Sequence, residues 1–246
     1  MTDAGKAVAA SDEGLRSLLE GGLHELGLDV DGRRVASLLA FADLLLRWNR
    51  TYNLTAIRTP RDVVTHHLLD CLAIIPALER QLSRTCGRRV LDVGSGAGLP
   101  GLVIAIVDPE AQVVCVDSVG KKAAFITQAI ASLGLENVEA VHGRVELLQR
   151  PAFDVIVSRA FSSLTDLVSA TERLLSPDGV WMAMKGRVPA AELQGLGASC
   201  MVHVEPIRVP EVHAERCMVL ITRHSESRCE HTPTGRSRVG LEKNPS

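Results

Sequence analysis

The sequence predicts an α/β protein in which a mostly parallel sheet follows an N-terminal helical region. Two observations lead to this prediction. Apolar residues recur with a helical period over the first 80 or so residues. From residue 88 onward, short apolar runs typical of strands alternate with helix-like segments, which indicates parallel strands joined by helical crossovers. The length of 246 residues suits one such domain with a small annex.

The composition excludes several classes of protein and of function. Apolar residues make up 46% and charged residues 23%, which excludes a mostly disordered or fibrous chain. Aromatic residues are only 3%, too few for a sheet that stacks many bases. The formal net charge is −2, so attraction to nucleic acid requires a local basic patch. No signal peptide or membrane-spanning run is visible, so a cytoplasmic protein is expected.

The helical region is predicted over residues 12–80, after a disordered segment over residues 1–11. Leucines between residues 15 and 26 keep a period of about 3.6, as the apolar face of a helix does. Gly27 suits the end of this first helix.

Two further helices follow in the same region. Asp31 is a suitable N-cap for a second helix, which fades near Asn53. Thr59 and Pro60 predict the start of a third helix, because threonine caps the first free N–H groups and proline fits the first turn. The apolar pattern continues this helix to Pro76.

The sheet domain is predicted over residues 88–223, and a disordered tail over residues 224–246. Its last two strands have no good helix between them, which predicts an antiparallel hairpin at the end of the sheet. Ser-Pro-Asp-Gly at 176–179 is a turn sequence that should end the last helix. Strands are predicted at 89–93, 112–116, 138–141, 154–157, 180–184, 201–205 and 217–222, and helices at 99–107, 120–133 and 164–175.

A glycine-rich turn follows the first strand. Residues 90–101 read Val-Leu-Asp-Val-Gly-Ser-Gly-Ala-Gly-Leu-Pro-Gly. Glycines suit a backbone that takes positive φ or approaches a ligand closely, and the next helix offers unpaired N–H groups. Asp92 precedes the turn, where a carboxylate is expected to meet a cationic part of the ligand. The predicted ligand-binding residues of this turn are Asp92, Gly94, Gly96 and Gly98.

A second acid ends the next strand. Asp117 lies 19 residues after Gly98. An acid at about this distance from a glycine turn holds a ribose hydroxyl in nucleotide-binding folds. The pair of features therefore predicts a ligand that contains adenosine.

Two ligands of this kind remain open. Gly96, Gly98 and Gly101 also satisfy Gly-x-Gly-x-x-Gly, which is typical of nicotinamide dinucleotide sites. Against that reading, the register that directly follows the strand has Leu99 in place of the third glycine, and Asp92 would face a pyrophosphate. S-Adenosylmethionine has no phosphate and carries an amine and a sulfonium, so the two acids favour it.

Several further blocks resemble one family in the same order along the chain. From Trp48 to Ile221 the sequence is similar to the RsmG family, also called glucose-inhibited division protein B, of bacterial 16S ribosomal RNA guanine-N7 methyltransferases. The matching blocks are Trp48-Asn49, Tyr52-Asn53-Leu54-Thr55, His67-x-x-Asp70, the loop 92–101, Asp117-Ser118 with Lys121-Lys122, Arg144-Val145-Glu146, Ser158-Arg159-Ala160-Phe161 and Lys185-Gly186.

The resemblance implies a fold, a cofactor and a substrate. The fold is the Rossmann-like class I S-adenosylmethionine-dependent methyltransferase fold, with a mostly parallel seven-stranded sheet. The reaction is methylation of N7 of guanine 527 in the 530 loop of 16S ribosomal RNA. The family often has Arg-His at 66–67, serine at 71 and Arg-His at 216–217, where this chain has His-His, cysteine and Arg-Cys. The implied cofactor contacts fall on Gly94, Leu99, Val145, Glu146 and Arg159.

The chemistry needs few catalytic groups. Guanine N7 has a free lone pair and no proton, so its methylation needs no general base, and alignment supplies most of the catalysis. Arg159 follows the strand 154–157, and Lys185 closes the strand 180–184. Both lie at the carboxyl edge of the sheet, where such folds bind ligands. Arg159 and Lys185 are the predicted catalytic residues.

The RNA contacts are expected near the end of the second helix. Four arginines lie between residues 47 and 61 with no acid among them, and Trp48 and Tyr52 are interleaved. We expect a monomer, with no metal site and no membrane contact. The partner is 16S ribosomal RNA or the 30S subunit, with a small-molecule methyltransferase or a cofactor-holding ribosome assembly factor as alternatives. The predicted RNA-binding residues are Arg47, Arg50, Asn53, Arg58 and His67.

Overall fold

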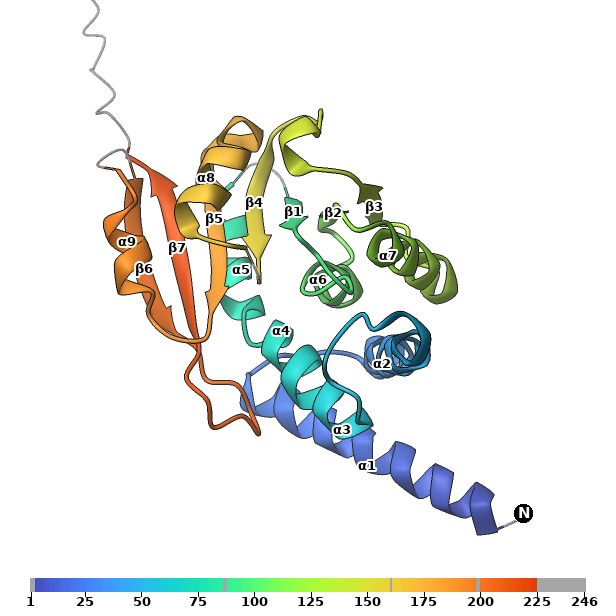
Figure 1. Ribbon diagram of the computed structural model, residues 1–246. Helices are drawn as coiled ribbons and strands as arrows, with labels where there is room; N and C mark the ends of the chain where they lie inside the picture. Colours follow the sequence, from blue (N-terminus) through green and yellow to red (C-terminus); the bar gives the residue numbers. More distant parts are fainter. Residues whose placement is uncertain (1–2, 86–87, 160, 198–199, 225–246) are drawn as a thin grey trace, which may run out of the picture.

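A seven-stranded sheet forms the centre of the protein (Figure 1). The computed structural model describes residues 3–85, 88–159, 161–197 and 200–224, with side chains from residue 12. The strand order is β3-β2-β1-β4-β5-β7-β6. β1 to β5 are parallel, and β7 runs antiparallel to β5 and β6, which confirms the predicted hairpin. The strands are β1 Arg89–Val93, β2 Gln112–Asp117, β3 Val138–His142, β4 Phe153–Ser158, β5 Leu175–Lys185, β6 Cys200–Pro206 and β7 Cys217–Arg223.

The N-terminal helices begin at the predicted caps. The Asp31 carboxylate accepts the N–H groups of Arg33 and Arg34, both at 2.9 Å, and Thr59 accepts that of Asp62 at 3.2 Å. The first helix begins at Asp3, within the segment predicted to be disordered. Alanine is the strongest helix former, and this segment is rich in it. The elements are α1 Asp3–Glu25, α2 Gly32–Tyr52, α3 Pro60–Val63, the π-helix η1 Val64–Leu69, α4 Asp70–Leu72 and α5 Ile75–Leu82.

The predicted third helix is not one continuous α-helix. It changes to a π-helix at Val64 and returns to α-helical geometry at Asp70. Pro76 does not end it but lies in the first turn of the next helix, α5, where a missing N–H costs nothing. π-Turns inside helices occur frequently at functional sites, and this one contains His67.

Two apolar layers cover the two faces of the sheet, as a parallel sheet requires. Val90 of β1 packs against the N-terminal helices and also against α6 and α7. Its neighbour Leu91 packs on the other face of the sheet, with α8. The two layers together enclose the strands that end at the functional site. The helices of this part are α6 Gly101–Val107, α7 Gly120–Leu133, α8 Leu164–Thr171 and α9 Ala190–Gln194.

The predicted helix 164–175 and the turn after it are partly wrong. The α-helix stops at Thr171, one 3₁₀ turn follows, and β5 begins at Leu175. Phe153 of β4 pairs with Leu175, and Val155 already pairs with Val180. The Ser-Pro-Asp-Gly segment is therefore an irregularity inside the strand pairing rather than a connection between a helix and a strand. Its turn-forming residues suit both arrangements.

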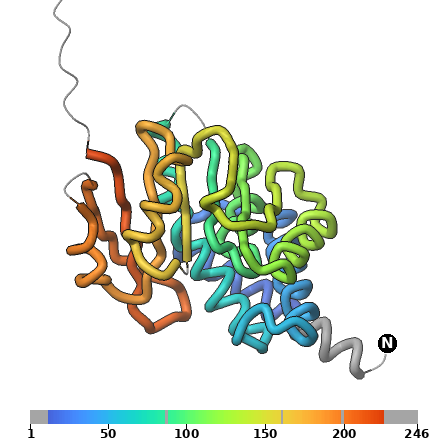
Figure 2. Tube along the Cα trace, turned by 45° about the horizontal axis from the view of Figure 1, so that its top comes forward, coloured from blue at the N-terminus to red at the C-terminus, as the bar shows by residue number. Residues whose placement is uncertain are grey.

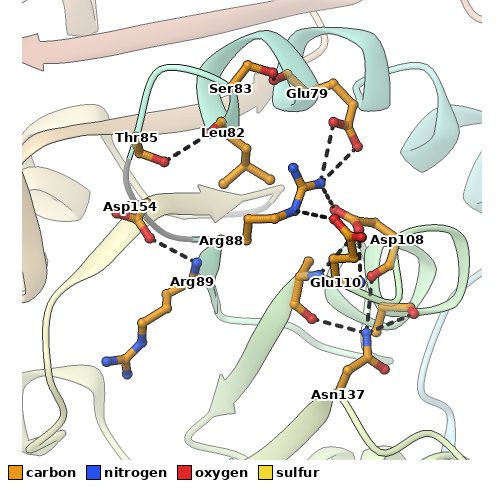
Figure 3. Close-up of polar contacts among 12 residues, drawn as sticks. Glu79, Leu82, Ser83, Thr85, Arg88, Arg89, Asp108, Glu110, Asn137 and Asp154 are labelled. Atoms are coloured by element: carbon orange, nitrogen blue, oxygen red, sulfur yellow. Dashed lines mark hydrogen bonds and ion pairs between the residues drawn. The ribbon is translucent and has the colours of Figure 1, made fainter.

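Polar contacts at the amino ends of the strands fix β1 and β2 to the helices (Figure 3). Arg88, just before β1, forms ion pairs with Glu79 of α5 and with Asp108, which follows α6. The amide of Asn137 donates to the carbonyls of Ala105 and Ala111, each at 3.1 Å. These contacts lie opposite the carboxyl edge and leave that edge free for a site.

Within the helical region, η1 and α4 reach the carboxyl end of β4, whereas α5 contacts the amino end of β1. Arg159, which follows β4, contacts residues of η1 and α4. Figures 1 and 2 show the β6–β7 hairpin at one side of the molecule and β3 with α7 at the other. No described helix is long and apolar enough to cross a membrane. Apart from His224, the predicted disordered tail lies outside the described residues.

Candidate functional site

The glycine turn after β1 takes the conformation that glycine favours. Gly94, Gly96 and Gly98 have φ values of 67°, 59° and 77°. Gly94 is exposed, its N–H donates to the carbonyl of Val116 at 2.9 Å, and a Cβ built on it would meet no atom within 4 Å. At Gly98 a Cβ would lie 2.4 Å from Leu102. Gly94 therefore offers open backbone, whereas Gly98 is needed for packing behind the turn.

Asp117 holds the glycine turn and the start of α7 together. One carboxylate oxygen accepts the N–H of Gly96 and the other accepts that of Val119, both at 2.8 Å. A carboxylate has about four lone-pair positions. These two backbone N–H groups therefore use only part of its acceptor capacity.

A cavity of about 520 Å³ lies between this turn and the turn after β3, and we call it the glycine-loop cavity. It brings together residues from the ends of three neighbouring strands, as predicted for Gly94, Asp117, Val145 and Glu146. Its lining residues are Val93, Gly94, Val116, Asp117, Ser118, Val119, Lys122, Gly143, Arg144, Val145, Glu146 and Phe161.

Sequence reasoning missed the residue that holds one wall of this cavity. Arg173, in the 3₁₀ turn after α8, donates to the carbonyls of Val145 at 2.9 Å, Glu146 at 2.9 Å and Leu148 at 2.7 Å. The partners are 25 to 28 residues apart in the chain. No local sequence pattern signals such a contact.

Asp92 does not face the glycine-loop cavity, which corrects the expected contact with a ligand. Its side chain is fully buried, and its Oδ2 accepts the N–H of Gly101 at 2.8 Å at the start of α6. Leu99 is also buried, with 3% of its surface exposed, and packs in the core. In the structure, Asp92, Gly98 and Leu99 shape the turn from behind.

Burial raises the pKa of Asp92 to about 7, and its Oδ1 has no hydrogen-bond partner among the described residues. The unfolded carboxyl has a pKa near 3.8, so between pH 4 and 7 the folded state holds a proton that the unfolded state has lost. Stability therefore falls as pH rises through this window.

Asp92→Asn should remove this pH dependence, because an amide stays neutral and still accepts from Gly101. We expect the free energy of unfolding of the wild type, relative to Asp92→Asn, to fall by on the order of 2 kcal/mol from pH 5 to pH 8. Urea denaturation without ligand measures the difference. An equal difference at both pH values would show that Asp92 ionises normally.

Arg159 lies where the helical region meets the carboxyl end of β4. Its Nη1 is 3.2 Å from His67 Nδ1 and 3.7 Å from Asp70 Oδ2. It lines a second cavity, of about 440 Å³, between the ends of β4, β5 and β7 and the helical region, which we call the arginine cavity. Its lining residues are Ile57, His66, Asp70, Arg159, Met184, Lys185, Gly186, Ile207, Arg216 and Cys217.

His67 is not available to RNA, contrary to the prediction. Only 4% of its surface is exposed, and its Nε2 lies 2.8 Å from Thr55 Oγ1. Burial, followed by the nearby charge of Arg159, lowers the pKa of His67 to about 4, so the ring is neutral at pH 7. Nδ1 of this neutral ring lies 3.0 Å from the His66 carbonyl and 3.2 Å from Arg159 Nη1. It donates to the carbonyl in one tautomer and accepts from Arg159 in the other.

Asp70 and Arg216 form an ion pair that sequence reasoning did not identify. Arg216 Nε donates to Asp70 Oδ1 at 2.9 Å, across 146 positions of sequence. Lys185, predicted to be catalytic, lines the arginine cavity, but its amino group lies 2.9 and 3.1 Å from the two carboxylate oxygens of Glu192 on α9. The charge of Lys185 is thus offset by an acid that the sequence pattern did not connect with it.

The predicted RNA-binding residues of α2 and its following loop are on the surface. Arg47 pairs with Asp43 at 2.9 Å, and Arg58 donates to Asn53 at 3.0 Å. Arg50 is exposed and makes no ion pair or side-chain hydrogen bond with the part of the chain described. Trp48 packs against Tyr52 and Phe125, with ring centroids 4.9 and 5.5 Å away, and so is directed inward.

Comparisons with known proteins identify the family. The family model described as rRNA small subunit methyltransferase G matches residues 34–221. A relative of that name from Polaromonas naphthalenivorans is 50% identical over 216 residues, which are 86% of this chain and 97% of the relative. Another, from Methylibium petroleiphilum, is 52% identical over 206 residues, 83% of this chain and 93% of the relative.

Solved structures are similar in fold at low identity. The O-methyltransferase TomG from Streptomyces achromogenes, solved in complex with SAM, matches with a TM-score of 0.52 at 17% identity over 83% of this chain and 96% of that chain. TrmN from Thermus thermophilus matches with a TM-score of 0.51 at 20% identity over 65% and 53%. The predicted class I methyltransferase fold is confirmed. With a family model that matches well over half of its length, the chain belongs to the rRNA small subunit methyltransferase G family.

Proposed function

We propose that this protein transfers a methyl group from S-adenosylmethionine to N7 of guanine 527 in the 530 loop of 16S ribosomal RNA. Membership of the rRNA small subunit methyltransferase G family is the observation that carries the proposal. Two cavities at the carboxyl edge support it, one beside the glycine turn and one beside Arg159. Their combined lining provides room for a cofactor and for one base.

The glycine-loop cavity fits S-adenosylmethionine. At Gly94 the backbone is exposed, and the space that a Cβ would fill is open to the ligand. The Asp117 carboxylate keeps lone pairs that can accept hydrogen bonds from a ribose. The exposed Glu146 carboxylate stands at the rim, and Val145 provides an apolar surface for adenine. When bound, the cofactor supplies a methyl group on a positively charged sulfur, which makes that methyl electrophilic. Gly94, Asp117, Val145 and Glu146 line this cavity and would hold it, whereas Arg159, also predicted to contact the cofactor, lines the arginine cavity.

The described residues act by alignment rather than by proton transfer. Guanine N7 is an unprotonated acceptor, so no group has to remove a proton, and bringing the two partners together contributes most of the rate. The Asp70 carboxylate pairs with the Arg159 guanidinium, and the neutral ring of His67 lies beside it. Arg159 and Lys185 lie at the ends of adjacent strands and are proposed to orient the base and its phosphate. Arg50, Arg47 and Arg58 are proposed to contact RNA outside the cavities.

One methylation assay tests the proposed function. The protein is incubated with labelled S-adenosylmethionine and 16S ribosomal RNA, free or in 30S subunits, from cells that lack the modification. We expect N7-methylguanine at one position of the 530 loop. No label at that guanine would contradict the proposal. Transfer to metabolites alone would favour a small-molecule methyltransferase. Cofactor binding without any transfer would favour an assembly factor, and binding of NADH would favour a nicotinamide enzyme.

Arg173→Met should weaken cofactor binding by about tenfold, because three carbonyls of the wall 145–148 lose their donor. Titration calorimetry with S-adenosylmethionine measures the dissociation constant. Arg88→Met is the control, since Arg88 pairs with Glu79 and Asp108 at the amino ends of the strands, opposite the cavity. Both variants should lower the melting temperature, but only Arg173→Met should change the dissociation constant. Equal affinities in the two variants would contradict the positioning role.

A further inference from the structure

The arginine cavity holds one carboxylate between two guanidiniums. Asp70 Oδ1 accepts from Arg216 Nε at 2.9 Å, and Asp70 Oδ2 lies 3.7 Å from Arg159 Nη1. Among the described residues that line the cavity, Asp70 supplies the only carboxylate. Its pairing with Arg159 does not by itself give this acid a contact with the substrate.

Asp70 keeps acceptor positions that its neighbours do not use. A carboxylate has about four lone-pair positions, and Arg216 and Arg159 use two of them at most. The Asp70 side chain is 8% exposed, and it lines the cavity. Arg159 and Arg216 are each about one quarter exposed, so both also keep N–H groups that can reach a ligand. The cavity therefore presents two acceptors beside free donors.

This pattern is the complement of guanine. The Watson–Crick edge of guanine places two donors, N1–H and the N2 amino group, beside the O6 acceptor. A carboxylate can accept from both donors while a neighbouring guanidinium donates to O6. Adenine has a donor at the place of O6 and an acceptor at N1, so it would set a donor against the guanidinium and an acceptor against the carboxylate. A site strongly rejects a base that leaves its buried polar groups unpaired in this way.

The position of the cavity also suits the reacting atom. O6 and N7 share the edge of guanine that faces away from N2. In the sheet, β4 lies directly between β1, whose turn forms the glycine-loop cavity, and β5. A base held by Asp70 at its far edge would direct N7 toward the end of β4 and the glycine-loop cavity. The cavity volume of about 440 Å³ accommodates one nucleotide.

We propose that the arginine cavity is the pocket for the target guanine and that Asp70 is its specificity-determining residue. In this pocket Asp70 accepts hydrogen bonds from N1–H and N2–H of the base. The proposal rests on the proposed function, and it adds a substrate contact that neither the glycine turn nor the family motif specifies.

The test compares guanosine with inosine at the target position, because inosine lacks only the N2 amino group. Small subunits are reconstituted with 16S ribosomal RNA ligated from a synthetic segment that carries either nucleoside. Transfer of labelled methyl groups gives kcat/KM for each. A hydrogen bond to a charged acceptor predicts that the wild type prefers guanosine by about ten- to a hundredfold. Equal rates on the two substrates would overturn the proposal, whereas no transfer to guanosine would overturn the proposed function itself.

Two substitutions separate recognition from structural support. Asp70→Asn replaces one acceptor by a donor and should reduce the preference for guanosine to near one. Asp70→Glu keeps the carboxylate and should retain the preference at a lower rate. A role limited to holding Arg159 and Arg216 would lower both rates together and leave the preference unchanged in Asp70→Asn, which would overturn the assignment. Should Asp70→Asn be inactive on both substrates, loss of the preference in Asp70→Glu would overturn it instead.

Discussion

Replacing Arg159 by alanine is expected to lower kcat/KM for methyl transfer to 16S ribosomal RNA by about two to three orders of magnitude. Arg159 lines the arginine cavity and contacts both His67 and Asp70. Its removal leaves the buried Asp70 carboxylate with Arg216 as its remaining ion-pair partner among the described residues. Removing one preorganised donor that acts on the reacting groups costs about 3–4 kcal/mol of transition-state stabilisation, which corresponds to this loss of rate.

Two variants serve as controls for Arg159→Ala. Arg150→Ala removes a surface ion pair with Glu139, outside both cavities, and should leave kcat/KM unchanged. Arg159→Lys keeps the charge but loses the planar fork and should fall between the wild type and alanine. Single-turnover transfer of labelled methyl groups to 30S subunits measures all three. A rate for Arg159→Ala within about threefold of the wild type would exclude a role in orienting substrate or cofactor.

Gly94→Ala is expected to raise the dissociation constant for S-adenosylmethionine by about tenfold or more. The new methyl group would project from the turn into the glycine-loop cavity, where the space at Gly94 is open and backbone must approach the ligand. The positive φ of 67° adds a strain of about 1 kcal/mol to the folded state. Stability and cofactor affinity should therefore both fall.

Gly134→Ala separates these two effects. Gly134 caps α7 with a φ of 63°, and a Cβ there would also meet no atom within 4 Å. The two substitutions carry a similar backbone strain, but Gly134 does not line the glycine-loop cavity. We expect similar losses of melting temperature in both variants, and weaker binding in titration calorimetry for Gly94→Ala alone. Unchanged affinity in Gly94→Ala would mean that the cofactor does not approach this backbone.

Much of the fold could be predicted because its signals are local. Asp31 and Thr59 cap their helices with their own side chains, and the apolar runs of β1 and β2 are buried on both faces. Local signals are ambiguous where one residue type suits two structures. Ser-Pro-Asp-Gly favours a turn, and the structure accommodates it inside β5 because Phe153 and Val155 of β4 pair on either side of it.

The candidate site was only partly predictable. Gly94 directly follows β1 and Asp117 ends β2, so the sequence alone places both at the carboxyl ends of strands. The structure places both in one cavity. Asp92 also lies at the carboxyl end of a strand, but its side chain points toward α6, where its carboxylate accepts the N–H of Gly101. Sequence position therefore identified which residues reach the carboxyl edge of the sheet, but the direction of each side chain depended on its neighbours.

The sequence by itself determined the order of helices and strands, the glycine turn, the acid that follows it and the family. Only the tertiary structure brought Asp70, Arg159 and Arg216 together, across up to 146 positions of sequence. It also connected Arg173 with the wall 145–148 and Lys185 with Glu192. Helix caps and turns involve neighbouring residues, so short patterns predict them. Contacts between distant charged side chains depend on how the helical region packs against the sheet, and no spacing along the chain encodes that packing.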